Sequence, residues 1–125
     1  MGVRTDVDST KTQSSNNVTV TVNVTDKGGG GSSAFRADVR AYVLEPKKLK
    51  ILEKTVDPTS GSGMTVKVNV AKGTVEWLNA LVPKESRDFE FDVECLGGGS
   101  SKVKATAYRK DEGLEHHDHE QVHCS

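Results

Sequence analysis

The sequence predicts an all-β protein folded as an antiparallel β-sandwich of seven or eight strands. Apolar residues recur at every second position in many segments, which is the pattern of strands with one buried and one wet face. Clusters of turn-forming residues separate these segments at short intervals. No segment has a helical period, and none is a crossover long enough for parallel pairing. Together these observations favour two packed antiparallel sheets.

The first well-defined strand is expected at 17–26, where valine alternates with threonine and asparagine. A glycine run at 28–31, followed by two serines, then forms a flexible turn. The second strand is expected at 34–45, with an apolar row that begins at Phe35. It stops at Pro46, because proline cannot donate a hydrogen bond to a strand ladder.

The remaining strands follow the same period of two. We expect them at 3–7, 49–56, 64–70, 73–81, 87–96 and 102–109. The predicted core consists of Val20, Val22, Val24, Val39, Val43, Val68, Trp77, Leu81, Phe89, Phe91 and Val93.

Length and composition indicate a single domain with a thin, aliphatic core. The chain has 125 residues, of which 34% are hydrophobic, and this length suffices for one two-layer core. We expect a polar linker at 1–16 that can include the first strand, and the sandwich itself at 17–110. A polar, histidine-rich and disordered tail is expected at 111–125.

Charge and hydropathy argue against two classes of partner. The 17 basic and 18 acidic residues nearly balance, and no basic stripe is interleaved with aromatic residues, so nucleic-acid binding is not supported. No apolar run approaches the roughly 20 residues of a membrane span. The N-terminus has no apolar signal region, so the chain is either cytosolic or a piece of a longer secreted chain that lacks its signal peptide, and we favour the second.

The two cysteines, Cys95 and Cys124, fit either one disulfide or two free thiols. Cys95 is in phase with Phe91 and Val93, so we expect a buried thiol that packs as a small hydrophobe. Pairing with Cys124 requires the C-terminal segment to fold back.

The candidate metal ligands lie near the C-terminus and are His116, His117, His119 and His123. Imidazole groups with a carboxylate and a thiolate nearby suit Zn, Ni or Cu. The segment from Leu114 also resembles the start of an expression-vector histidine tag. We therefore expect no cofactor. An enzyme is not expected either, because a cysteine–histidine nucleophile in a free tail lacks fixed geometry.

An acidic row lies on the wet face of one expected strand and consists of Asp88, Glu90, Asp92 and Glu94. Carboxylates about 7 Å apart along one strand do not converge on a calcium ion. We expect Lys102 and Lys104 to be the cross-strand partners of this row.

The segment from Gly73 to Val93 resembles a pattern found in Ig-like modules of prokaryotic surface proteins. A strand with a central tryptophan, Trp77, leads to Leu81, a proline-containing turn and an alternating aromatic strand. The modules it resembles are the CARDB-type and related repeat domains of adhesins and S-layer-associated proteins. The resemblance implies an antiparallel Ig-like β-sandwich in which Trp77 fills the core and Leu81 closes one end. It also implies adhesion, spacing or substrate presentation, with no shared catalytic residues.

We therefore expect a non-catalytic extracellular or cell-surface accessory module, acting as a spacer or as a weak protein- or carbohydrate-binding unit. Its expected partners are an unidentified protein or glycan at a cell surface and other domains of a longer parent chain. Tyr42 and Tyr108 are out of phase with the core and are the candidates for stacking on a sugar. The alternative function is metal binding through the C-terminal histidines.

Overall fold

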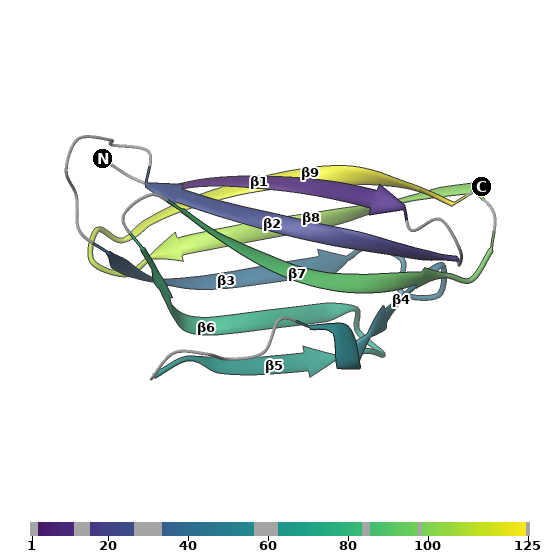
Figure 1. Cartoon of the computed structure of the whole chain (residues 1–125), viewed down its shortest axis with the longest axis horizontal. Helices are drawn as coiled ribbons and strands as arrows, with labels where there is room; N and C mark the ends of the chain where they lie inside the picture. The colour runs from purple at the N-terminus through teal and green to yellow at the C-terminus, as the bar shows by residue number, and fades with distance from the viewer. Residues whose placement is uncertain are drawn as a thin grey trace.

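The structure is a computed structural model that describes residues 3–11, 16–26, 34–56, 63–83, 86–97 and 99–124. Within these residues, nine strands form two antiparallel sheets packed face to face (Figure 1). This confirms the Ig-like β-sandwich, with one or two strands more than expected. The described part of the chain contains no helix that is long and apolar enough to cross a bilayer.

Eight of the nine strands overlap the predicted ranges, and the last strand was not predicted. The four-stranded sheet has the order β1 (Val3–Lys11), β2 (Asn17–Asp26), β7 (Ser86–Cys95) and β4 (Leu49–Leu52). The five-stranded sheet has the order β5 (Thr65–Asn69), β6 (Thr74–Val82), β3 (Phe35–Val43), β8 (Gly99–Arg109) and β9 (Leu114–Cys124). A short 3-10 helix, η1 (Glu53–Thr55), ends the segment that was expected to continue as a strand.

The core lies between the sheets and is filled by alternate residues of each long strand. Three buried valines of β2 pair with buried residues of β7: Val18 with Val93, Val20 with Phe91 and Val22 with Phe89. Trp77 of β6 is fully buried, and its ring lies 5.2 Å from that of Phe89 and 6.1 Å from that of Phe91. The prediction that Trp77 fills the core is confirmed.

One predicted core residue, Leu81, lies instead on the surface. The inward positions of β6 change phase after Trp77 and continue at Ala80 and Val82, which leaves Leu81 outward and 41% exposed. The phase changes because β6 contains one residue more than β3 between paired positions, which is a β-bulge. The prediction for Leu81 was therefore wrong. Val68, also placed in the core, is only partly buried on the edge strand β5.

Side chains of neighbouring strands hold this bulge in place. Leu78 and Asn79 lie opposite the single residue Asp38, and Asn79 has a φ of 59°. The Asn79 backbone N–H donates to Asp38 Oδ1 at 2.8 Å, and Arg36 donates to the Asn79 carbonyl at 3.1 Å. The Asn79 amide also donates to the Gly63 carbonyl at 3.1 Å. An asparagine is suited to this position, because it tolerates the left-handed region better than most residues.

The last strand, β9, closes one side of the sandwich against β1 (Figure 1). These two strands are edge strands of different sheets, and side chains rather than a ladder connect them. His116 Nδ1 accepts a hydrogen bond from the Thr5 backbone N–H at 3.1 Å, and the Thr5 hydroxyl donates to the His116 carbonyl at 2.9 Å. Asp118 Oδ2 accepts from the Val7 backbone N–H at 3.0 Å. These contacts satisfy donors that an open strand edge would leave unpaired.

Both ends of the domain differ from the expected boundaries. Val3–Lys11 forms a full strand where a linker with a short strand was expected, and Leu114–Cys124 forms a strand where a disordered tail was expected. The inward side chains of β9 are mostly polar, because they meet the backbone edge of β1 rather than the apolar core. The segment therefore lacks the apolar alternation that identified the other strands.

A buried arginine joins the two sheets at one end of the sandwich. Arg109 of β8 and Asp26 of β2 are 3.2 Å apart, and their side chains are 5% and 2% exposed. The Arg109 guanidinium also donates to Asp111 at 2.7 Å and lies 3.6 Å from Glu112. It stacks over the Phe35 ring at 4.2 Å. The hydrogen bond from Arg109 lowers the pKa of the Asp111 carboxyl.

Candidate functional site

The four histidines predicted as metal ligands all lie on β9, but they do not share one side of it. His116 faces inward and is bonded to β1, whereas His117, His119 and His123 face outward along the edge of the five-stranded sheet. Among the described residues, no group of three or more His, Cys, Asp or Glu side chains is arranged to hold a metal ion. Metal binding by these histidines stays a prediction.

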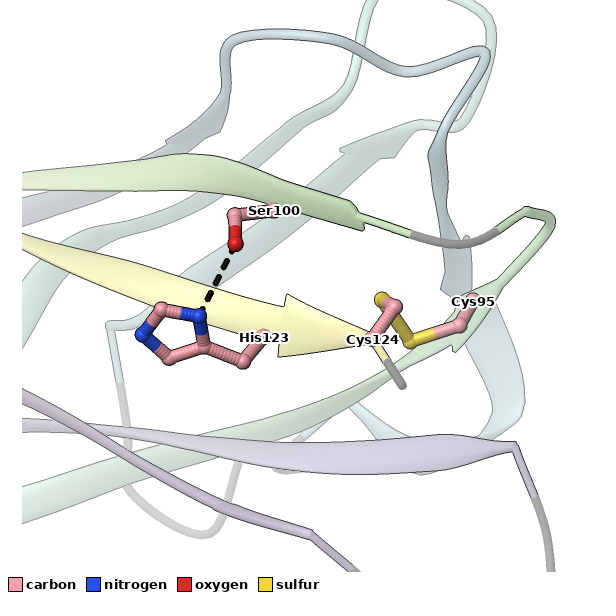
Figure 2. Close-up of a disulfide and its surroundings, with 4 residues drawn as sticks. All are labelled: Cys95, Ser100, His123 and Cys124. Carbon is pink, nitrogen blue, oxygen red and sulfur yellow. Dashed lines mark hydrogen bonds between the residues drawn. A yellow bond between two sulfur atoms is a disulfide. The ribbon is translucent and has the colours of Figure 1, made fainter.

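A disulfide ties the end of β9 to the end of β7. Figure 2 shows Cys95 bonded to Cys124, with Cα atoms 5.8 Å apart. The two strands belong to different sheets, so this bond joins the sheets covalently. The expectation of a free buried thiol at Cys95 was wrong, because the C-terminal segment folds back as β9. In the disulfide neither sulfur is a thiolate, so neither is a metal ligand or a nucleophile.

Beside the disulfide, the Ser100 hydroxyl and His123 Nδ1 are 2.8 Å apart (Figure 2). A serine–histidine contact is one part of a hydrolase triad, which also needs a third group to orient the imidazole. In the described part of the chain, Ser100 is the hydrogen-bond partner of His123, and the contact is exposed. The contact between Ser100 and His123 links the paired ends of β8 and β9.

We expect reduction of the disulfide to lower the free energy of unfolding by about 2–4 kcal/mol. The bond closes a loop between residues 29 apart in sequence, and reduction frees that loop in the unfolded chain. Urea unfolding with and without reductant measures the difference. A Cys95→Ala, Cys124→Ala double variant is the control, because its midpoint is expected not to respond to reductant. Equal midpoints for the oxidised and reduced wild-type chain would contradict this expectation.

The outward side of the five-stranded sheet carries six basic side chains among the described residues. We call it the basic face. It carries Arg36, Arg40, Lys67, Lys102, Lys104 and Lys110 against Asp38, Glu76 and Glu115, with the three outward histidines on its β9 edge. These positions alternate with buried residues, which is why they share one side of the sheet.

Two of these six cations, Arg40 and Lys110, form ion pairs on the face itself. Arg40 Nε is 2.7 Å from Glu76 Oε2, and this hydrogen bond raises the pKa of Arg40. Lys110 Nζ is 3.6 Å from Asp38 Oδ1. In the part of the chain that the structure describes, neither Lys102 nor Lys104 is in an ion pair. Two lysines without an ion pair therefore lie two residues apart on the outward side of β8.

Two shallow hollows lie on the basic face beside these lysines. One, of about 480 Å³, is lined by Arg40, Tyr42, Leu44, Lys104, Thr106 and Glu115. The other, of about 350 Å³, shares Leu44 and adds Lys102 and Gln121. Leu44 is 55% exposed. The mixture of arginine, tyrosine and an exposed aliphatic side chain is typical of protein-binding surfaces.

The outward side of the four-stranded sheet has the opposite charge. We call it the acidic face. It carries Asp6, Asp8, Asp88, Glu90, Asp92 and Glu94 against Arg4 and Lys50. Among the described residues, none of the four β7 carboxylates is in an ion pair.

On β2 the neighbours of the β7 carboxylates are uncharged side chains, whereas on β4 Lys50 lies opposite Glu94. Thr19 donates a hydrogen bond to Asp92 at 2.8 Å, and the Asn23 amide donates to Asp88 at 2.7 Å. The expectation that Lys102 and Lys104 pair with this row was wrong, because β8 lies in the other sheet. The same alternation that revealed the acidic row also marked both lysines as outward. Sequence alone did not assign the two rows to opposite sides of the molecule.

A larger hollow, of about 890 Å³, lies beside β4 and η1. Its lining is a mixture of aliphatic and charged residues that includes Ile51, Leu52, Lys54 and Val70. The polar side chains of this lining are those of Lys50, Glu53, Lys54 and Thr55. We therefore take the two charged faces as the candidate binding surfaces of the described domain.

No protein-family model and no curated protein matches the sequence. The fold is similar to that of the collagen-binding domain from a Staphylococcus aureus adhesin. The TM-score is 0.64 at 11% identity, with 98% of this chain and 97% of that chain covered. It is also similar to a type II cohesin domain from the cellulosome of Acetivibrio cellulolyticus, with a TM-score of 0.56 at 12% identity over 90% of this chain and 89% of that one.

A third similar structure is the C-terminal domain of the Streptococcus agalactiae AgI/II polypeptide BspA. The TM-score is 0.61 at 13% identity, with 97% of this chain and 49% of that chain covered. The chain therefore spans about half the length of that structure. It has the Ig-like fold of adhesin and cohesin domains. At these identities the similarity concerns the fold, and the CARDB-type resemblance is not tested by it.

Proposed function

We propose that the chain is a non-catalytic extracellular or cell-surface module that binds a protein partner through the basic face. The observation that carries this proposal is that Lys102 and Lys104, neither of which is in an ion pair in the described structure, line hollows on the basic face together with Tyr42 and the exposed Leu44. Partners docked on such a face gain from aromatic and arginine contacts and are guided to it by charge.

Two further observations support an extracellular setting. The Cys95–Cys124 disulfide joins the sheets, and disulfides persist mainly in oxidising compartments. The structural neighbours include a collagen-binding adhesin domain and a cellulosomal cohesin domain. The exposed leucine favours a polypeptide over a glycan, because an aliphatic side chain cannot stack on a sugar ring as an aromatic one does.

Triple-helical collagen is the first probe, because one structural neighbour is named for binding collagen. Surface plasmon resonance with immobilised collagen is expected to show saturable binding that a Lys102→Thr, Lys104→Thr variant weakens at least tenfold. A Thr19→Ala, Thr21→Ala variant on the opposite sheet face is the matched control and is expected to bind as wild type does. Binding that both variants retain in full would contradict the basic face as the binding surface. Absence of binding would remove collagen from the class of partners.

A further inference from the structure

We propose that the basic face of one copy docks on the acidic face of a second copy, so that the chain stacks through its two sheet faces. This inference rests on the proposed function, because both use the basic face. The molecule itself carries both of the surfaces that would meet. The outward sides of its two sheets have opposite charge, and in the described structure neither the β8 lysines nor the β7 carboxylates are in an ion pair.

The donor side of the contact is the strand β8. Lys102 and Lys104 are exposed and lie two residues apart on the outward side of β8. Their ladder neighbours on β9 are Gln121 and His119, neither of which is an anion. The neighbour of Lys104 on β3 is Tyr42, which carries no carboxylate. Glu45 lines the same hollow as Lys102, and Glu115 the same hollow as Lys104, but neither carboxylate forms an ion pair with these ammonium groups in the described structure. A docked carboxylate can therefore still neutralise them.

The acceptor side of the contact is the strand β7. Glu90 and Asp92 lie two residues apart on the outward side of β7, so their spacing along the strand matches that of the two lysines. Thr19 and Thr21 of β2 hydrogen bond to these carboxylates, which fixes their direction without neutralising them. The lysines of a second copy supply cations to this row, and they reduce the repulsion between its carboxylates.

Overall charge does not oppose the stack. The formal net charge of the chain is −1, so copies do not repel one another strongly at long range. The two contacting faces differ from each other, so the interface is heterologous and its repetition gives an open array rather than a closed dimer. Charged faces of this kind are screened by salt, with a Debye length of about 10 Å at 0.1 M.

Sedimentation velocity across a concentration series tests the stack directly. At low ionic strength the wild-type chain is expected to show a weight-average mass that rises with concentration and falls back to the monomer value as salt is added. A basic-face variant, Lys102→Thr with Lys104→Thr, is expected to stay monomeric. An acidic-face variant, Glu90→Gln with Asp92→Asn, is expected to stay monomeric too, and it keeps the acceptor oxygens for β2.

Mixing the two variants supplies the most specific outcome. Each retains one intact face, so the equimolar mixture is expected to form a one-to-one pair that does not grow further. A Lys47→Thr, Glu53→Gln variant, changed outside both faces, is the matched control and is expected to associate as wild type does. A wild-type chain that stays monomeric at low salt would overturn the proposal, and so would association that survives both face variants. Collagen binding by a chain that remains monomeric would leave the proposed function standing while the stack fails.

Discussion

Replacement of Trp77 by alanine is expected to lower the free energy of unfolding by about 3–5 kcal/mol. The indole is fully buried between the sheets and contacts the rings of Phe89 and Phe91. Its removal leaves a cavity that the surrounding β-branched residues cannot fill without moving strands. Urea or thermal unfolding followed by circular dichroism measures the loss.

Leu81→Ala is the matched control, because Leu81 lies on the same strand and is of the residue type that usually belongs to a core. It is 41% exposed beyond the bulge, so the expected loss is within about 0.5 kcal/mol. If the two variants lost equal stability, the phase change in β6 would be refuted.

Arg109→Met is expected to lower the free energy of unfolding by about 3–5 kcal/mol, chiefly because it removes the cation beside the buried Asp26 carboxylate. The Asp26 side chain is 2% exposed and has Arg109 at 3.2 Å. Glu112 loses its cationic neighbour at the same time, and its Oε1 is already buried without a hydrogen-bond partner in the described structure. The loss of the guanidinium stack on Phe35 adds to the effect.

A second variant separates the charge effect from lost packing. Arg109→Met combined with Asp26→Asn removes the unpaired charge, so it is expected to recover part of the stability. Arg40→Met is the control for an arginine in an exposed ion pair: its bond to Glu76 is about one-third exposed, and the expected loss is about 0–1 kcal/mol. If Arg40→Met cost as much as Arg109→Met, burial would not be what makes Arg109 important.

The parts of the fold that depend on alternation could be predicted from the sequence. The strand at 17–26 was predicted with the bounds that β2 has, because its valines face the core along the whole length. Trp77 and the phenylalanines of β7 were placed in the core for the same reason. Alternation does not identify an extra residue in a strand, and so Leu81 was misplaced by the bulge at Asn79.

The strand β9 was missed because its buried side faces a backbone edge and not a core. His116 and Asp118 serve there as hydrogen-bond acceptors for β1, which favours polar residues at inward positions. The same omission hid the disulfide, since Cys124 reaches Cys95 only when β9 is a strand. A period of two was present in 114–124, with His116, Asp118 and Val122 on one side, but its inward residues were not apolar.

The charged faces could be predicted only in part. The sequence revealed the acidic row of β7 and the outward lysines of β8, and cross-strand pairing between them was a reasonable expectation for neighbours in one sheet. The two rows are not cross-strand neighbours, because β7 and β8 follow one another in the chain but belong to different sheets. Strand order depends on contacts between distant segments, which local periodicity does not contain.

Amide chemical shifts in a dilution series test most directly whether copies of this domain contact one another through their two oppositely charged sheet faces. As concentration rises at low salt, the amides around Lys102 and Lys104 on β8 and around Glu90 and Asp92 on β7 are expected to shift together. The amide of Val20, which lies on a buried strand position, is expected to change little. Shifts confined to the β4 and β5 edges, or the absence of any shift, would contradict the claim.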